Sequence, residues 1–285
     1  PVQEGRRLPP FVFAGETAGD LAARHPAESA ASRIAAWLAV ESEATAWGQA
    51  PELTTALILS PGSAGLFFHE TVGHLLQGEG ASVLNGDAAR LSSLLTVIEH
   101  PANVRGRGRY EHDDEGVAPS PVVLVGKGRI AGRIFGRGSD GSAARSTGSG
   151  RRQSFRDLPL PRLATTCVAQ GQDDPAEILS STERGILVEE IRSGNVDPLS
   201  GEFSLHATRG RIIEKGRLAS ATGQFMILGT VPNSLKAIDR VGNNASDDGG
   251  VSVCVHHGQA VPVIVGLPTL RIATIRVRSL EMVRT

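Results

Sequence analysis

Cysteine is scarce in this sequence, since Cys167 and Cys254 are the only two in 285 residues. A secreted protein built on disulfides carries several cysteines at regular spacings, so the sequence excludes a disulfide framework of that kind. Two thiols so far apart favour a reducing compartment instead. We therefore expect a cytoplasmic protein.

Long apolar runs are also missing. No stretch reaches the roughly 18 uninterrupted apolar residues of a transmembrane helix, and residues 1–10 mix charges and prolines where a signal segment would be apolar. The formal net charge is −1, which gives a nucleic-acid partner no support. We expect neither membrane nor nucleic acid among the partners. Hydrophobic residues make up 40% of the chain, enough for the core of a globular protein.

The first part of the chain indicates two helices separated by a strand. Residues 28–47 combine helix formers with apolar residues at helical spacing, which predicts an amphipathic helix. Residues 53–59 form a short apolar run that predicts a strand. A Pro-Gly-Ser-Ala-Gly loop follows at 61–65, and residues 66–76 predict a second helix.

From residue 80 onward, short runs of Val, Ile and Leu alternate with Gly, Asn and Asp, which is typical of strands and turns. Gly126-Lys127-Gly128 predicts the turn of a hairpin within residues 121–135. The Gly- and Ser-rich residues 137–150 predict a long loop, and residues 175–181 a short helix. Further strands are expected at residues 186–191, 202–208, 211–214, 225–231, 251–256 and 261–265.

The most informative motif is the run His-Glu-Thr-Val-Gly-His at residues 69–74. Imidazole and carboxylate are groups that bind zinc and activate its water. In a helix, residues four positions apart share a face, whereas a spacing of five rotates His74 away from His69. A π-bulge shifts the local pairing to i+5, and Gly73 eases the distortion. We therefore predict a π-bulge between Val72 and His74.

A catalytic zinc ion takes three protein ligands and one water, so a third ligand must come from elsewhere in the chain. Cys254 is the strongest candidate, because residues 251–255 form a strand-like run that places a thiol beside a glycine-rich turn. His256 and His257 are alternatives. On a strand, His256 shares a face with Cys254, whereas His257 does not.

Basic residues beyond the glycine-rich loop are candidates for substrate binding, because arginine can hold a carboxylate or carbonyl oxygens. They are Arg151, Arg152, Arg156 and Arg162. The alternative is a solvated basic loop paired with Asp140 and Asp157.

Two further features favour structural roles. The acidic run Asp113, Asp114 and Glu115 could suggest a second metal, but an acidic turn is the better interpretation. Cys167 stands among small and apolar residues and fits a small core residue.

Residues 61–74 resemble the signature of the TldD/PmbA family, once called modulators of DNA gyrase and now regarded as metallopeptidases. The similarity continues in the family's order over about residues 28–275. The segments that carry it are 113–116, 150–162, 183–186, 258–263 and 266–270.

The resemblance implies a zinc ion bound by His69, His74 and Cys254, with Glu70 as the general base. It also implies a TldD-like subunit of a homodimer or heterodimer that encloses a central cavity. The implied substrates are unfolded peptides, including leader segments of ribosomally made natural products.

Members of the family usually carry a sizeable α/β domain before the segment that begins near residue 28. We expect residues 1–27 to be an N-terminal extension and residues 28–285 to be the catalytic domain. Because Pro1 is not an initiator methionine, the sequence indicates a processed chain or a fragment of a longer one. The family's usual N-terminal domain is not part of this sequence, so we expect either the catalytic half of a longer protein or a naturally short relative that relies on a partner.

The expected fold class is α+β, a β-rich catalytic domain of twisted, mostly antiparallel sheets with the motif-bearing helix packed on them. The expected function is zinc-dependent hydrolysis of unfolded peptides. One expected use of this activity is the maturation of a ribosomally made peptide. An exposed sheet edge in the second half could bind a peptide as an added strand. The alternatives are a noncatalytic binding subunit of a heterodimer, and a zinc hydrolase that acts on a nonpeptide amide or ester.

Overall fold

The structure is a computed structural model of the chain. It describes residues 2–3, 6–7, 31, 35, 52–78, 82–84, 90–101, 107–137 and 146–280. At the N-terminus, β1 (Val2–Gln3) pairs antiparallel with β2 (Arg6–Arg7). The helix predicted at residues 28–47 lies outside the described residues, apart from Ala31 and Ala35, which are helical.

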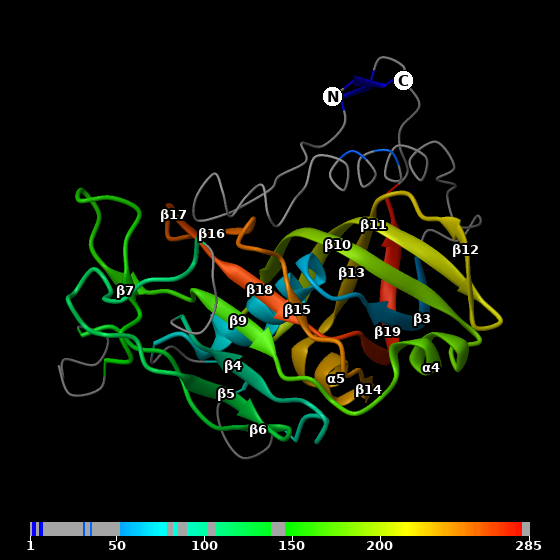
Figure 1. Cartoon of the computed structure of the whole chain (residues 1–285), viewed down its shortest axis with the longest axis horizontal. Helices are drawn as coiled ribbons and strands as arrows, with labels where there is room; N and C mark the ends of the chain where they lie inside the picture. The colour runs from blue at the N-terminus through cyan, green and yellow to red at the C-terminus, as the bar shows by residue number, and fades with distance from the viewer. Residues whose placement is uncertain are drawn as a thin grey trace.

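The larger sheet occupies the right side of Figure 1 and contains seven strands within the described residues. Strand β10 pairs in parallel with β3 and antiparallel with β11, so the strands close into a ring. The strands are β3 (Glu52–Leu59), β10 (Arg184–Val196), β11 (Glu202–Glu214), β12 (Arg217–Ala221), β13 (Phe225–Thr230), β14 (Ile238–Val241) and β19 (Leu270–Ser279).

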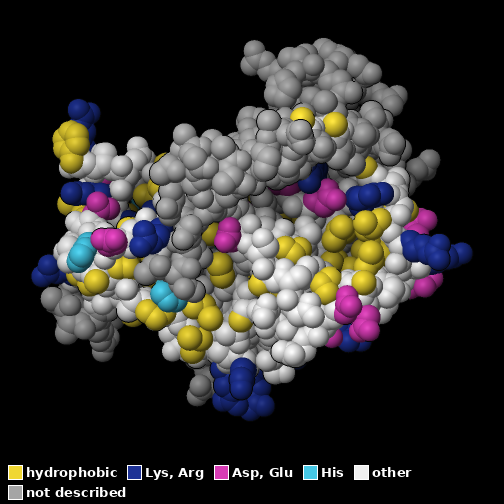
Figure 2. All heavy atoms as spheres, in the orientation of Figure 1, with side chains coloured by type: hydrophobic (Ala, Val, Ile, Leu, Met, Phe, Trp, Pro, Cys, Tyr) yellow, Lys and Arg dark blue, Asp and Glu magenta, His cyan; other side chains and the backbone are white. Residues whose placement is uncertain are grey.

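The smaller sheet lies at the lower left of Figure 1, with the order β15-β18-β9-β4-β5-β6 in the described part of the chain. Its β9 and β18 run parallel, and its other neighbours are antiparallel. The strands are β4 (Val97–Glu99), β5 (Val122–Gly126), β6 (Arg129–Ile130), β9 (Thr165–Val168), β15 (Ser246–Asp247) and β18 (Ile264–Leu267). In Figure 2, basic side chains gather at the lower edge of the molecule, near β6.

A short helical segment lies between the two sheets. It comprises η1 (Ser63–Gly65), α3 (Leu66–Phe68), η2 (His69–Gly73) and η3 (His74–Leu76). Helix α3 contacts β10 of the larger sheet and β9 of the smaller one. Phe67 and Phe68 are fully buried, and the Phe67 ring packs edge-on against Phe203 of β11 at 5.5 Å between centroids. One apolar core, to which both sheets contribute, therefore surrounds the segment.

Close packing of this segment needs glycine at Gly65. A Cβ atom there would lie 2.7 Å from the backbone nitrogen of Gly266 in β18, closer than real Cβ contacts allow. The absence of a side chain lets the helical segment approach the smaller sheet.

Two small hairpins project at the left side of Figure 1. Strand β7 (Gly150–Arg151) pairs with β8 (Leu160–Pro161), and β16 (Val253–His256) pairs with β17 (Gln259–Pro262). His257 and Gly258 turn the second hairpin with positive φ angles of 48° and 75°. Two consecutive residues with positive φ are typical of a tight hairpin turn.

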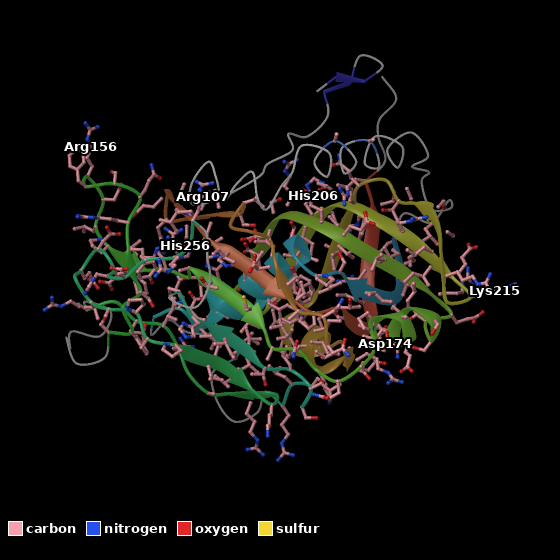
Figure 3. All side chains as sticks on the ribbon, viewed as in Figure 1. Arg107, Arg156, Asp174, His206, Lys215 and His256 are labelled. Carbon is pink, nitrogen blue, oxygen red and sulfur yellow. The ribbon has the colours of Figure 1, made fainter. Side chains whose placement is uncertain are left out.

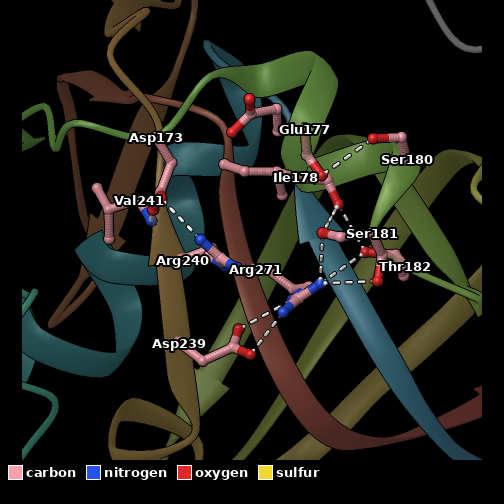
Figure 4. A network of polar contacts seen from close by, with 10 residues as sticks. All are labelled: Asp173, Glu177, Ile178, Ser180, Ser181, Thr182, Asp239, Arg240, Val241 and Arg271. Atoms are coloured by element: carbon pink, nitrogen blue, oxygen red, sulfur yellow. Dashed lines mark hydrogen bonds and ion pairs between the residues drawn. The ribbon is translucent and has the colours of Figure 1, made fainter.

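A polar network fastens helix α4 (Pro175–Ser180) to the larger sheet (Figure 4). Arg271 of β19 donates to both carboxylate oxygens of Asp239 at 2.9 and 2.7 Å. Its remaining nitrogen donates to the hydroxyls of Ser181 and Thr182, at 3.2 and 3.1 Å, just beyond the end of α4. The hydrogen bonds to Asp239, together with its charge, raise the pKa of the Arg271 guanidinium. The other described helix on this side, α5 (Val231–Lys236), contacts β13 and β19.

The β-rich architecture agrees with the predicted one, and most predicted strands are present. The hairpin turn at residues 126–128 joins β5 and β6. Two boundaries were wrong: residues 202–208 and 211–214 belong to one continuous strand, β11, and residues 261–265 are divided between β17 and β18. Both errors concern backbone continuity, which partner strands decide. In the described residues, no helix has the length and apolar character needed to cross a bilayer.

Candidate metal centre

Three potential metal ligands converge where the helical segment meets the hairpin β16–β17. One ligand atom from each of His69, His74 and Cys254 lies within 4.8 Å of the other two. The Sγ atom of Cys254 is 3.4 Å from Nε2 of His74. The imidazole rings of His69 and His74 are nearly perpendicular, with centroids 4.9 Å apart.

The backbone of η2 brings the two histidines together. Residues His69–Gly73 form a π-helical turn, and the backbone N–H that closes it runs from His74 to the carbonyl of His69. An α-helix would turn His74 about 140° away from His69, whereas an i+5 pairing restores a common face. Gly73 has no side chain, and an added Cβ would overlap Leu163.

Zinc fits this set of atoms. Two ligands on a tetrahedral zinc ion lie roughly 3.5 Å apart, close to the separation between Cys254 and His74. Nε2 of His69 is fully buried and has no hydrogen-bond partner among the described residues, an arrangement that is costly unless another group binds there. Burial lowers the pKa of His69 well below its usual value and that of His74 to about 3, so both rings stay neutral, as metal ligands must be.

Glu70 is the carboxylate next to this cluster. Its Oε2 lies 3.9 Å from Nε2 of His74, and its side chain is mostly buried. Burial raises the pKa of Glu70 to about 7. Gly194 of β10 faces it, and a Cβ there would lie 3.0 Å from Cγ of Glu70. The larger sheet thus leaves room for this carboxylate, which can exchange a proton near neutral pH.

Arg162 lies behind the cluster and does not fit the predicted substrate-binding role. It is completely buried, and it donates to the main-chain oxygens of Cys254 and Gln259 at 2.8 and 3.2 Å. It also donates to Sγ of Cys254 at 3.3 Å. Burial raises the pKa of the Cys254 thiol, and the neighbouring Arg162 charge opposes that shift. Arg162 therefore orients the thiol and favours its thiolate form.

Arg151, another predicted substrate-binding residue, is mostly buried but lines a pocket beside β17. It is 7% exposed and donates to the carbonyls of Leu163 and Pro262, both at 2.8 Å. Both arginines donate to main-chain oxygens of two different segments and so hold these segments together. A buried guanidinium group needs several acceptors of this kind.

Arg152 and Arg156 remain accessible. Arg152 lies 3.8 Å from Asp114 and contributes to a pocket of about 210 Å³ beside β17. Arg156 stands over the exposed ring of Phe155 and points away from the body of the molecule (Figure 3). Asp140 lies outside the described residues, and Asp157 accepts a hydrogen bond from Ser154 at 2.7 Å.

His256 and His257, the alternative ligands, border the cluster. The ring of His256 is 5.0 Å from that of His74 and 4.1 Å from that of His257, between centroids. Burial lowers the pKa of His256 to about 4. Within the described residues, neither histidine belongs to a group of three potential ligands.

The acidic run forms a turn, as expected. Asp113 accepts bonds from the backbone nitrogens of Glu115, Val117 and Gly150, which leaves its carboxylate engaged by the chain itself. Cys167 is partly buried on β9, and burial raises the pKa of its thiol to about 12, which makes it a poor nucleophile.

Two residues close to the cluster escaped the sequence analysis. Thr166 of β9 lies 3.4 Å from Nδ1 of His69, and Glu99 of β4 lies 3.2 Å from the Thr166 hydroxyl. A signal was available for Glu99, because this carboxylate directly follows the apolar run at residues 97–98. Charged residues in such runs are buried only when they have partners.

Comparison with known proteins identifies the class. The family model described as "PmbA/TldA metallopeptidase C-terminal domain" matches residues 53–279. A metalloprotease TldD homolog from Haemophilus influenzae is 32% identical over 239 residues, which cover 80% of this chain and 49% of the relative. A zinc metalloprotease TldD homolog from Saccharolobus solfataricus is 26% identical over 241 residues, 78% of this chain and 51% of the relative. The match defines a metallopeptidase domain.

The chain belongs to the PmbA/TldD family. It spans about half the length of the curated relatives it matches. Among solved structures, TldE from Thermococcus kodakarensis superimposes with a TM-score of 0.64, covering 87% of this chain and 55% of the other at 18% identity. At that identity, the likeness concerns the fold.

Proposed function

We propose that this chain is the catalytic part of a zinc-dependent peptidase, with His69, His74 and Cys254 as metal ligands and Glu70 as the general base. The observation that carries the proposal is the convergence of three ligand atoms within 4.8 Å, next to a carboxylate whose pKa is about 7. Mixed imidazole and thiolate ligation suits zinc better than magnesium or calcium. The thiolate requires a reduced cysteine, which suits the cytoplasm.

A bound zinc ion supplies Lewis-acid chemistry, because it lowers the pKa of water that it binds to about 7 and polarises a carbonyl. Glu70 takes the proton of the attacking water and gives it to the leaving amine. Burial favours the protonated form of Glu70, which helps this carboxyl to deliver the proton to the leaving amine. Burial within the helical segment keeps Glu70 next to His74 while these transfers occur.

Unfolded peptides are the proposed substrates, bound along the open edge of β16. Among the described strands, β16 pairs with β17 alone. The side chain of Cys254 points inward, whereas Val253 and Val255 are 48% and 69% exposed. An extended peptide that paired with β16 would run directly beside the ligand cluster, and main-chain bonding would require little sequence preference.

Among the predicted substrate-binding arginines, Arg152 is accessible and lines the pocket beside β17, and we propose that it contacts a substrate carboxylate there. A related subunit, in a homodimer or heterodimer, would complete the substrate chamber. Maturation of a ribosomally made peptide is one use of such an activity.

The test joins metal content with cleavage of an unstructured peptide. Wild type should hold about one zinc per chain, and Cys254→Ala should lose it. Cys167→Ala is the matched control, since it removes the other free thiol and should retain zinc. Glu70→Gln should keep the metal while cleavage falls by about 100- to 10,000-fold.

Other outcomes separate the alternatives. A zinc-loaded wild type that cuts neither alone nor with a related subunit would favour a noncatalytic binding subunit. Cleavage of an ester or small amide without peptide cleavage would favour a nonpeptide hydrolase. A wild type that binds no zinc would contradict the proposed site.

A further inference from the structure

Behind His69, a relay of three buried polar side chains, His69, Thr166 and Glu99, leads away from the ligand cluster. Nδ1 of His69 lies 3.4 Å from the hydroxyl of Thr166, and that hydroxyl lies 3.2 Å from Oε2 of Glu99. His69 and Thr166 are fully buried and Glu99 is 1% exposed, so water does not compete for these contacts. A buried network of polar side chains is costly unless every donor and acceptor in it has a hydrogen-bond partner.

The smaller sheet holds Glu99, the end of the relay that is farthest from the ligand cluster. Glu99 of β4 stands opposite Thr166 of β9 in the antiparallel register. The other carboxylate oxygen of Glu99 accepts the backbone N–H groups of Ala164 and Thr165, at 2.6 and 2.8 Å. Burial raises the pKa of Glu99, while these bonds and the nearby Arg151 charge favour its ionised form. The carboxylate is thus held in one orientation.

The number of protons available fixes the direction of the hydrogen bonds in this relay. Two backbone N–H groups already donate to one oxygen of Glu99, so an ionised Glu99 can only accept at the other oxygen, and the single hydroxyl proton of Thr166 then goes to Glu99. The Thr166 oxygen is then left to accept, and Nδ1 of His69 must be the protonated nitrogen. A neutral imidazole carries one proton, so Nε2 keeps its lone pair. Nε2 is also the His69 atom that is buried with no partner among the described side chains and backbone.

We propose that Glu99 and Thr166 are positioning residues that fix His69 in the tautomer with the proton on Nδ1, so that Nε2 is presented to the metal. This inference rests on the proposed function in so far as His69 is a zinc ligand. The Glu99 carboxylate acts on His69 through the Thr166 hydroxyl. Loss of a hydrogen-bond partner of a metal-binding histidine commonly lowers metal affinity by about 10- to 100-fold.

Thr166→Val tests the relay, because valine keeps the shape of threonine and removes the hydroxyl. Zinc affinity, measured by competition with a chelator, should fall by about 10- to 100-fold, and Thr166→Ser should restore most of it. Thr165→Val is the matched control. Thr165 is 1% exposed on the same strand, and its hydroxyl has no partner in the part of the chain that the structure describes, so its removal should leave zinc affinity unchanged.

Glu99→Gln tests the direction of the hydrogen bonds in the relay. The amide oxygen can still accept the two backbone N–H groups, which leaves its NH₂ to donate to Thr166. Thr166 must then donate to Nδ1, and the His69 proton should move to Nε2. Histidine ¹⁵N NMR of the metal-free protein reads this change directly, and it should accompany a loss of zinc affinity in the same range as for Thr166→Val.

The NMR measurement separates failure of the relay from failure of the proposed function. An Nε2-protonated His69 in metal-free wild type, or zinc binding by Thr166→Val equal to wild type, would overturn the relay. A wild type that binds no zinc would overturn the proposed function, and the tautomer of His69 would still decide whether the relay operates.

Discussion

Arg162 donates from a single guanidinium nitrogen to both the main-chain oxygen and the sulfur of Cys254, at 2.8 and 3.3 Å. The side chain comes from the residue after β8, whereas Cys254 lies in β16. One buried cation therefore fixes the backbone and the thiol of the proposed ligand together. A thiolate ligand in an apolar surrounding needs such a positive neighbour.

Arg162→Lys should lower zinc affinity by about tenfold or more, because one ammonium group cannot reach Cys254 and Gln259 with the geometry of a planar guanidinium. Chelator competition measures the change. Arg151→Lys is the control, since Arg151 is also buried and donates to the carbonyls of Leu163 and Pro262, which belong to none of the three proposed ligand residues. Both variants should lose stability, but only Arg162→Lys should lose zinc affinity. Equal zinc affinities would show that Arg162 has no specific role at the thiol.

Gly73→Ala should destabilise the protein by about 1–3 kcal/mol, because the new methyl group overlaps the buried side chain of Leu163. Denaturant unfolding measures this change. Leu163→Ala alone should also destabilise, by about 2–5 kcal/mol, through the cavity that it leaves. The double variant should lose less than the sum of the two, because the smaller residue makes room for the methyl group. Strict additivity would place the strain elsewhere in η2.

The sequence predicts the local features of this site well and the long-range ones poorly. The spacing of His69 and His74 was sufficient to predict a π-bulge, because helix geometry depends on neighbours in the chain, and η2 has that geometry. Glu99 and Thr166 become neighbours only when β4 pairs with β9. The sequence predicts Arg162 as a substrate-binding residue or part of a solvated basic loop, whereas its burial depends on packing between β8 and the hairpin β16–β17.

Removal of zinc should lower the thermal stability of the wild type. A metal that binds only the folded chain stabilises it by about 2.7 kcal/mol at a free concentration 100 times its Kd. A chelator should therefore lower the melting temperature of the zinc-loaded wild type. Cys254→Ala lacks one of the three proposed ligands, so its melting temperature should not respond to the chelator. An equal response of both proteins would mean that the metal binds without Cys254.

Arg271 and Arg276 offer a comparison of two ion pairs on the same strand, β19. Arg271 is 14% exposed and joins Asp239 through two bonds, while it also holds the hydroxyls of Ser181 and Thr182 (Figure 4). Arg276 is 58% exposed, and one 3.1 Å bond connects it with Glu52.

Arg271→Ala should cost about 1–3 kcal/mol, because it leaves Asp239 and the two hydroxyls beyond α4 without their shared donor. Arg276→Ala should cost no more than about 0.5 kcal/mol, since solvent and salt screen an exposed pair. Urea unfolding at low and high salt measures both. Salt should reduce the small effect of Arg276→Ala further and leave most of the Arg271→Ala effect, because the latter depends on hydrogen bonds in a partly buried network. Equal effects of the two substitutions would mean that the Arg271 network does not fasten α4 to the sheet.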